Sequence, residues 1–178
     1  ISQWGHDFRP EYTQLATLRQ RFPSVPIMAL TATADRLTRD DISRQLGIPN
    51  ARLFMTSFDR PNIRLNVVSN ISSTDKMKMI TRFITAHRGE SGIIYCLRRT
   101  DTEKMATRLR SLGFNAAAFH AGMPVAEKEQ VQTAFLNDDL PIVCATIAFG
   151  MGINKSNVRW VIHSNMPKSI ECYYQEIG

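Results

Sequence analysis

From residue 62 onward, the hydrophobic and polar positions of the chain follow two alternating patterns. Short apolar runs rich in β-branched residues predict strands, and the longer segments between them have a helical period. The strands are expected at residues 64–68, 92–96, 116–120, 142–146 and 158–164, and the helices at residues 74–88, 100–112 and 124–136. This alternation is typical of βαβ units, so the sequence predicts an α/β fold with a parallel sheet and flanking helices.

Residues that commonly begin or end helices stand at the borders of these segments. Gly89 and Gly113 occupy places where a helix ends in the left-handed conformation. Thr100 and Glu103 have the spacing of a capping box, and Pro124 suits the first turn of a helix. These local signals agree with the predicted order of elements.

The first 60 residues are organised differently. Their pattern predicts a helix over residues 11–21, a strand over residues 27–30 and a helix over residues 35–46 that Gly47 ends. No internal repeat or low-complexity segment is present.

A boundary between two parts is expected near residues 58–62. Pro61 has no backbone donor and disfavours helical geometry at the residue before it. We therefore expect one part at residues 1–60 and another at residues 61–178. The chain starts in a structured segment and stops after a helix-like segment at residues 169–177, so we interpret it as a fragment.

Composition and charge narrow the possible functions. With 43% hydrophobic and 21% charged residues the chain is typical of a globular protein, and its longest apolar stretch falls short of the ~20 residues of a membrane span. The net charge of +6 favours an anionic partner such as nucleic acid or nucleotide. Because the charge is shared equally by residues 1–70 and 71–178, any anion site must be made by folding. The three cysteines lack metal-ligand spacing, so neither a metal site nor a disulfide framework is expected.

Two motifs of a complete nucleotide hydrolase are missing from the sequence. No glycine is followed by lysine, so the chain has no phosphate loop of the G-x-x-x-x-G-K-[ST] type. The paired aspartates at 40–41 and 138–139 fall in helical or turn contexts, so no acidic Mg²⁺-binding pair follows an apolar strand. We expect that this chain alone does not hydrolyse ATP.

An aromatic-rich segment opens the chain. Trp4 and Phe8 offer ring faces on which nucleic-acid bases can stack, and Arg9 can contact a phosphate or an aromatic ring. His6 lies between them. The alternative is a hydrophobic plug that docks on an adjacent core, and the residues alone leave both interpretations open.

Thr31 and Thr33 lie in the segment A-L-T-A-T-A after the strand predicted at residues 27–30. Their hydroxyls can form hydrogen bonds with backbone groups or with groups that relay between sites. A strand end that leads into a helix cap explains the same residues.

A second glycine-containing segment follows the strand at residues 142–146, where ligand sites of α/β sheets gather. Gly150 and Gly152 allow close backbone approach to a ligand, and Thr146 can bond a phosphate oxygen. Asn154 and Lys155 add polar groups and a charge. A tight turn between strands is the alternative, and the residue pattern favours anion binding.

These segments, in this order, resemble the central part of a RecQ-family DNA helicase of bacterial type. The resemblance covers essentially the whole chain. It is carried by residues 2–12 (SQWGHDFRPEY), 29–34 (ALTATA), 58–62 (FDRPN), 93–96 with Arg99, 120–122 (HAG), 146–155 (TIAFGMGINK) and 173–178 (YYQEIG).

The resemblance implies an ATP-driven motor of two RecA-like lobes that moves 3′ to 5′ on single-stranded DNA in repair and recombination. Residues 1–60 would end the first lobe, and residues 61–178 would form most of the second. The implied DNA-binding residues are Trp4, His6, Phe8, Arg9, Arg60, Arg99, His120, Thr146 and Lys155. The implied ATP-facing residues are Gly150, Gly152, Asn154 and Gln175, and Thr31, Thr33 and Gln175 would couple DNA binding to hydrolysis.

The family also implies ATP and Mg²⁺ as cofactors of the complete protein and zinc in a downstream domain. Its partners would be single-stranded and forked DNA and single-strand-binding protein, in the cytoplasm and at the nucleoid. The chain departs from the family pattern at Arg98, Ser156, Ser164 and Asn165, which puts the contacts around these positions in question. A non-catalytic DNA-binding or regulatory module with the same fold stays an alternative, and so does a plain nucleotide-binding domain.

Overall fold

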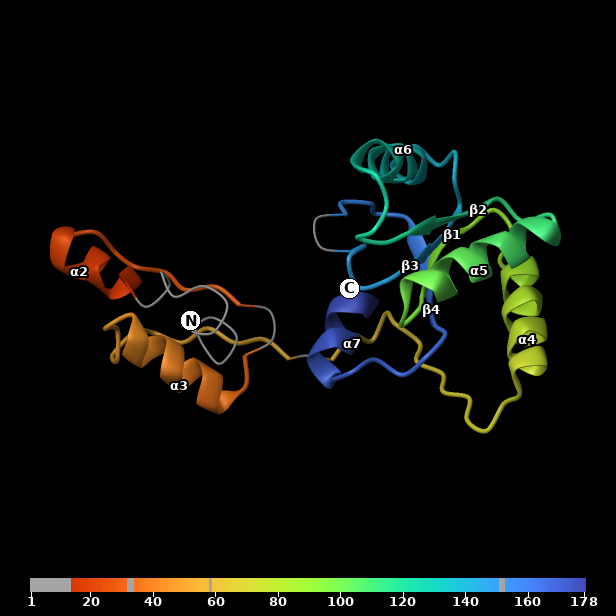
Figure 1. Ribbon diagram of the computed structural model, residues 1–178. Coiled ribbons are helices and arrows are strands. Elements are labelled where there is room, and N and C mark those ends of the chain that lie inside the picture. Colours follow the sequence, from red (N-terminus) through yellow and green to blue (C-terminus); the bar gives the residue numbers. More distant parts are fainter. Residues whose placement is uncertain (1–13, 32–33, 58, 151–152) are drawn as a thin grey trace. The chain divides into compact units, whose positions relative to one another are not determined.

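The computed structural model describes residues 14–31, 34–57, 59–150 and 153–178 (Figure 1). The chain divides into two compact units, residues 1–65 and residues 66–178. This division lies close to the boundary expected near residues 58–62. The assignment of the units to two helicase lobes stays a prediction.

The described part of the first unit contains two helices, α2 (Thr17–Arg21) and α3 (Arg36–Gln45). Asp35 begins α3, because its carboxylate accepts a hydrogen bond from the backbone N–H of Thr38 at 2.8 Å. The strand predicted over residues 27–30 does not form, and Met28 and Leu30 there are more than four-fifths exposed. The apolar run therefore has no strand to pair with among the described residues of this unit.

The second unit contains a four-stranded parallel sheet in the order β2-β3-β1-β4. The strands are β1 (Ser91–Tyr95), β2 (Ala116–Phe119), β3 (Ile142–Ala145) and β4 (Val158–His163). The helices are α4 (Ser73–Ala86), α5 (Arg99–Ser111), α6 (Val125–Leu136) and α7 (Ile170–Ile177). These elements confirm the α/β fold and the parallel sheet, but the strand predicted over residues 64–68 is wrong: that segment pairs with nothing described, and its Val67 is 83% exposed.

Side-chain alternation along the strands produces a core on each face of the sheet. Ile94 of β1 and Cys144 of β3 pack with the apolar residues of α4 and α5 on one face. Ile93 and Val143 pack with α6 on the other. Figure 1 shows α6 on one side of the sheet and α4 and α5 on the opposite side. Both faces are covered, as a parallel sheet requires.

The predicted helix borders are partly corrected. Gly89 and Gly113 have positive φ angles of 90° and 86°, which confirms their left-handed conformation. The capping box at Thr100 and Glu103 is wrong, because α5 begins one residue earlier than expected and Arg98 occupies its N-cap position without a side-chain bond. No described helix is both long and apolar enough to cross a membrane.

Candidate functional site

Three of the predicted DNA-binding residues meet at the carboxyl edge of the sheet. His120 directly follows β2, Thr146 directly follows β3, and Arg99 begins α5 shortly after β1. Two backbone hydrogen bonds extend the ladder past the strands, from Thr146 N to Phe119 O at 3.2 Å and from Cys96 N to Ala145 O at 2.8 Å. Since the three strands are parallel neighbours, these side chains come to one edge although the chain separates them widely.

His120 and Arg99 converge on Gly122. A Cβ atom at Gly122 would lie 3.0 Å from Nη1 of Arg99 and 3.3 Å from Nδ1 of His120. His120 is 5% exposed, and its Nε2 lies 3.0 Å from Oε1 of Glu103 on α5. Its Nδ1 is buried without a hydrogen-bond partner among the described residues. Glu103 thus holds the imidazole next to Gly122, where the exposed Arg99 also lies.

The loop after β3 is anchored by an aromatic side chain. The ring of Phe149 is 1% exposed and lies between those of Phe119 and Phe135, with centroids 4.6 and 5.5 Å away. The Phe149 N–H donates to Thr146 O at 3.0 Å, which closes a tight turn. The segment is therefore a turn that presents Thr146 at the carboxyl edge, and anion binding by it stays a prediction.

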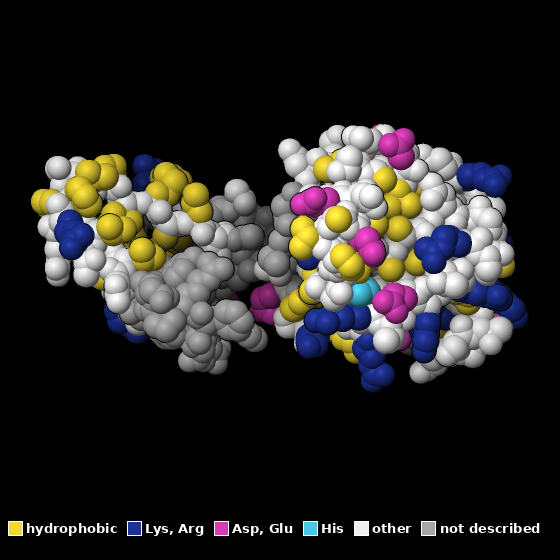
Figure 2. Space-filling model, turned by 45° about the horizontal axis from the view of Figure 1, so that its top comes forward, with side chains coloured by type: hydrophobic (Ala, Val, Ile, Leu, Met, Phe, Trp, Pro, Cys, Tyr) yellow, Lys and Arg dark blue, Asp and Glu magenta, His cyan; other side chains and the backbone are white. Residues whose placement is uncertain are grey.

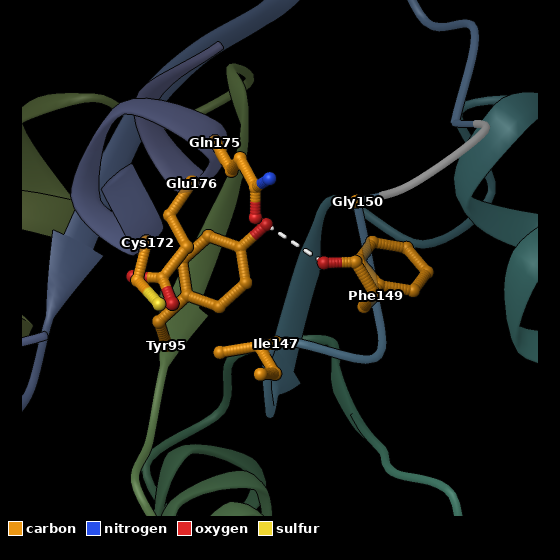
Figure 3. A pocket seen from close by; sticks show the side chains of 7 residues that line it. All are labelled: Tyr95, Ile147, Phe149, Gly150, Cys172, Gln175 and Glu176. Carbon is orange, nitrogen blue, oxygen red and sulfur yellow. Dashed lines mark hydrogen bonds between the residues drawn. The ribbon is translucent and has the colours of Figure 1, made fainter. Parts of the chain in front are cut away.

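A small pocket separates this loop from α7 (Figure 3). Its lining residues are Tyr95, Ile147, Phe149, Gly150, Cys172, Gln175 and Glu176. Its volume of about 20 Å³ is close to the room that one water needs, so it cannot hold a nucleotide. Gln175 is exposed at its border, where it could contribute one amide to a larger site.

Two titratable groups meet beside this pocket, Glu176 from its lining and the partly buried His163. Nε2 of His163, at the end of β4, lies 2.7 Å from Oε2 of Glu176 on α7. This contact is short, but it is not aligned as a hydrogen bond. Burial raises the pKa of Glu176 and lowers the pKa of His163, so both groups are shifted toward their neutral forms.

Lys155 has a structural partner. Its side chain is 2% exposed, and its Nζ donates to Oδ1 of Asp138 at 2.5 Å and lies 5.2 Å from the centre of the Phe135 ring. The Asp138 carboxylate also accepts from Asn157 and Ser91. A DNA contact at Lys155 would require the loss of its contact with Asp138. Nothing in the sequence indicated this pairing.

The other predicted residues are distributed over both units. Asn154 is exposed in the loop between β3 and β4, and Thr31 and Arg60 are exposed in the first unit. Several predicted residues lie outside the described ranges, namely Trp4, His6, Phe8, Arg9, Thr33 and Gly152. Within the described ranges, no group of three or more His, Cys, Asp or Glu side chains is placed to bind a metal ion.

Sequence reasoning missed Tyr95, Glu103, His163 and Glu176. Tyr95 ends an apolar strand, so its sequence context is that of one more core residue. The signal that could have identified it is its hydroxyl at the carboxyl end of the strand, where polar side chains reach the site. Glu103 was given a capping role, and the helical spacing that turns it toward His120 becomes apparent only when the start of α5 is known. His163 and Glu176 are 13 positions apart and meet only in the fold.

Charged side chains are exposed on the unit that holds the sheet. Figure 2 shows lysine and arginine side chains gathered along one border of the unit that holds the sheet, with acidic side chains among them. The net charge of +6 makes this distribution suitable for an anionic partner.

Comparisons with known proteins identify relatives over the whole chain. The chain is 55% identical over 178 residues to the "ATP-dependent DNA helicase RecQ" of Pasteurella multocida and 56% identical to that of Haemophilus influenzae. Each alignment covers 100% of this chain and 28% of the relative, so the chain spans just over a quarter of the length of these proteins. The "RecQ-like DNA helicase BLM" of Xenopus laevis is 46% identical over all of this chain and 13% of its own length.

A solved structure supports the fold. The crystal structure of a DEAD box protein from Methanococcus jannaschii matches 60% of this chain and 29% of its own, with a TM-score of 0.55 and 25% sequence identity. The helicase conserved C-terminal domain family matches residues 75–178, which include every strand of the sheet. These findings confirm the resemblance to RecQ helicases, and the chain belongs to the helicase conserved C-terminal domain family.

Proposed function

We propose that the intact protein is an ATP-dependent DNA helicase of RecQ type and that residues 61–178 supply most of its second lobe. The observation that carries this proposal is the convergence of Arg99, His120 and Thr146 at the carboxyl edge of the sheet. The 55% identity to a protein named a RecQ helicase supports it. Residues 1–60 belong to the first lobe in this proposal.

The carboxyl edge fits the backbone of single-stranded DNA. Arg99 offers a planar guanidinium for a phosphate, and the hydroxyl of Thr146 can bond a second phosphate oxygen. His120 is too buried to be the first contact, so it supports Arg99 from below while Glu103 fixes its ring. Lys155 acts indirectly, because it stabilises the end of the same loop through Asp138.

The first unit adds stacking and coupling groups in this proposal. Trp4 and Phe8 stack on bases, His6 and Arg9 assist them, and Arg60 contacts the backbone. Thr31 and Thr33 link this DNA contact to ATP hydrolysis.

ATP and Mg²⁺ bind in the intact protein, to which this chain contributes Gln175, Asn154 and the backbone at Gly150 and Gly152. The pocket beside Gln175 is too small for ATP, and the sequence has no phosphate loop. The chain alone is therefore proposed to be inactive as an ATPase. When bound, Mg²⁺ neutralises charge on the ATP phosphates.

The finer features of the proposal are those that the family resemblance implies. The motor moves 3′ to 5′, acts on single-stranded and forked DNA in repair and recombination, and meets single-strand-binding protein at the nucleoid in the cytoplasm. Zinc binds in a further domain outside this chain.

Strand separation by the intact protein tests the proposal. We expect ATP-dependent unwinding of a duplex with a 3′ single-stranded tail and little unwinding of one with a 5′ tail. DNA binding without ATP turnover would replace the helicase proposal with the non-catalytic DNA-binding module.

Two arginines of α5 provide a matched pair for the DNA contact. Arg99→Ala should weaken binding to single-stranded DNA of every sequence to a similar extent. It should also reduce the slope of the logarithm of the binding constant against the logarithm of the salt concentration by about the amount of one phosphate contact. Arg108→Ala, on the exposed part of the same helix, is the control and should leave both quantities unchanged. Equal effects of the two variants would mean that the carboxyl edge has no special role.

A further inference from the structure

Tyr95 connects the end of β1 to the loop after β3. Its side chain is 5% exposed, and its hydroxyl donates to the backbone carbonyl of Phe149 at 2.8 Å (Figure 3). Burial raises the pKa of Tyr95. The hydroxyl therefore stays protonated and available as a donor at all ordinary pH values.

The loop backbone passes close to this hydroxyl, so a side chain at position 150 would collide with it. Gly150 has a φ of +135°, and a Cβ atom there would lie 2.7 Å from the Tyr95 oxygen. The neighbouring Phe149 is held twice, by its ring between two other phenylalanines and by its carbonyl through Tyr95. The position of the loop thus depends on Tyr95 as well as on the aromatic anchor.

The other side of Tyr95 faces α7. Its ring stacks on that of His163, with centroids 5.6 Å apart and planes 19° from parallel. His163 in turn contacts Glu176 at 2.7 Å and lies 5.3 Å from the ring of Tyr173. Glu176 directly follows Gln175 on α7, so any shift of this helix moves both residues.

These contacts form a continuous path from the loop that carries Thr146 to the helix that carries Gln175. We propose that Tyr95 is a positioning residue that couples the loop after β3 to α7. It keeps Thr146, which contacts DNA, and Gln175, which contacts ATP, in fixed positions relative to each other. This inference rests on the proposed function, in which Thr146 faces DNA and Gln175 faces ATP. Tyr95 itself touches neither ligand.

Tyr95→Phe in the intact protein tests the coupling, because it removes the hydroxyl and keeps the ring. The measured quantity is the ratio of the ATPase kcat with single-stranded DNA to the kcat without it. We expect this ratio to fall by about three- to tenfold, the effect of losing one hydrogen bond, while the KM for ATP changes by less than about twofold. A variant that is merely destabilised loses active molecules, which lowers both rates equally and leaves the ratio unchanged.

Ser91→Ala is the matched control. Ser91 is 6% exposed and lies at the opposite end of the same strand, where its hydroxyl contacts Asp138 at 3.3 Å. This variant also removes one buried hydroxyl from β1, but at the amino edge of the sheet. We expect it to keep the ratio of the wild-type protein.

Hydrogen exchange of the intact protein supplies a second readout. The amides of residues 147–150 should exchange faster in Tyr95→Phe than in the wild-type protein, and Ser91→Ala should leave them unchanged. An unchanged kcat ratio or unchanged loop exchange in Tyr95→Phe would each overturn the inference and leave the proposed function standing. A wild-type protein without DNA-stimulated ATPase would overturn both.

Discussion

Replacing Phe149 by alanine should reveal how firmly the loop after β3 is tied to the core. Phe149 is the largest loop side chain in the second core cluster, is 1% exposed, and packs between Phe119 of β2 and Phe135 of α6. Its truncation leaves a cavity where β2, β3 and α6 meet. The surrounding side chains belong to regular elements and can collapse only partly into that space.

The expected cost follows from this burial. Truncation of a buried phenylalanine costs about 3–5 kcal/mol, and each lost aromatic pair contributes about 0.5–1.5 kcal/mol of specific interaction. Because two such pairs are lost, we expect a value in the upper half of the range, about 4–5 kcal/mol. That is a large share of the 5–15 kcal/mol that typically stabilises a domain.

Hydrogen exchange of the intact protein measures this cost locally. The amides of β3 should exchange on the order of 1,000-fold faster in Phe149→Ala, since every 1.4 kcal/mol corresponds to a factor of about ten. Phe83→Ala is the control, because Phe83 on α4 is also aromatic and in contact with Trp160 but is 37% exposed. Its truncation opens no closed cavity and should cost about 1–2 kcal/mol.

Two results would refute this reasoning. Exchange of the β3 amides within about tenfold of the wild-type rate would mean that the Phe149 ring contributes less than 1.4 kcal/mol and that the loop can leave the core at little cost. Equal effects of Phe149→Ala and Phe83→Ala would mean that burial does not decide the magnitude.

Three further outcomes are expected. Arg98→Ser should stabilise α5 by about 0.5–1 kcal/mol, because serine can cap the helix that now begins without a side-chain bond; a rise in the thermal midpoint checks this. Gly92→Ala should destabilise the second unit by about 1–3 kcal/mol, because its Cβ would lie within the ring of Trp160; a lower urea midpoint with Trp160 emission as the probe checks this. The hydrogen bond from Lys155 lowers the pKa of Asp138 below 3.8, so the stability it provides is present above that pH and lost as the pH falls through the folded value. Asp138→Asn should therefore flatten the loss of stability below pH 4, as urea midpoints across pH 2–6 would show.

The helices and strands of the second unit could be predicted because the local preferences of their residues agree with the packing that a covered parallel sheet needs. The runs at β1 and β3 are apolar on both faces, as strands covered by helices must be, and Gly89 and Gly113 end helices in the expected conformation. The run at residues 64–68 has the same β-branched character and forms no strand, because no neighbour pairs with it among the described residues. The strand propensity of a segment does not show whether a neighbouring strand is there to pair with it.

The candidate site was predictable only where strand order decides it. His120 and Thr146 are each the last residue of a predicted strand, so a parallel sheet was enough to bring them to one edge. The role of Lys155 could not be foreseen in the same way, because its partner Asp138 adopts a left-handed conformation with a φ of 67°, and its carboxylate contacts three side chains. Side-chain pairing of this kind depends on exact loop paths that sequence patterns do not encode.

In the proposed function the intact protein pulls on DNA, and the strand order then has a mechanical consequence. Arg99, His120 and Thr146 follow three adjacent strands that all run in the same direction. A load on these side chains along the strand axis would pull the three strands in the same direction. Any difference in force between two neighbouring strands would act as shear along the whole ladder of hydrogen bonds that joins them. The ladders would then share the load and would not open one bond at a time. A parallel sheet that presents its contacts at a single edge is thus arranged to bear tension without unzipping.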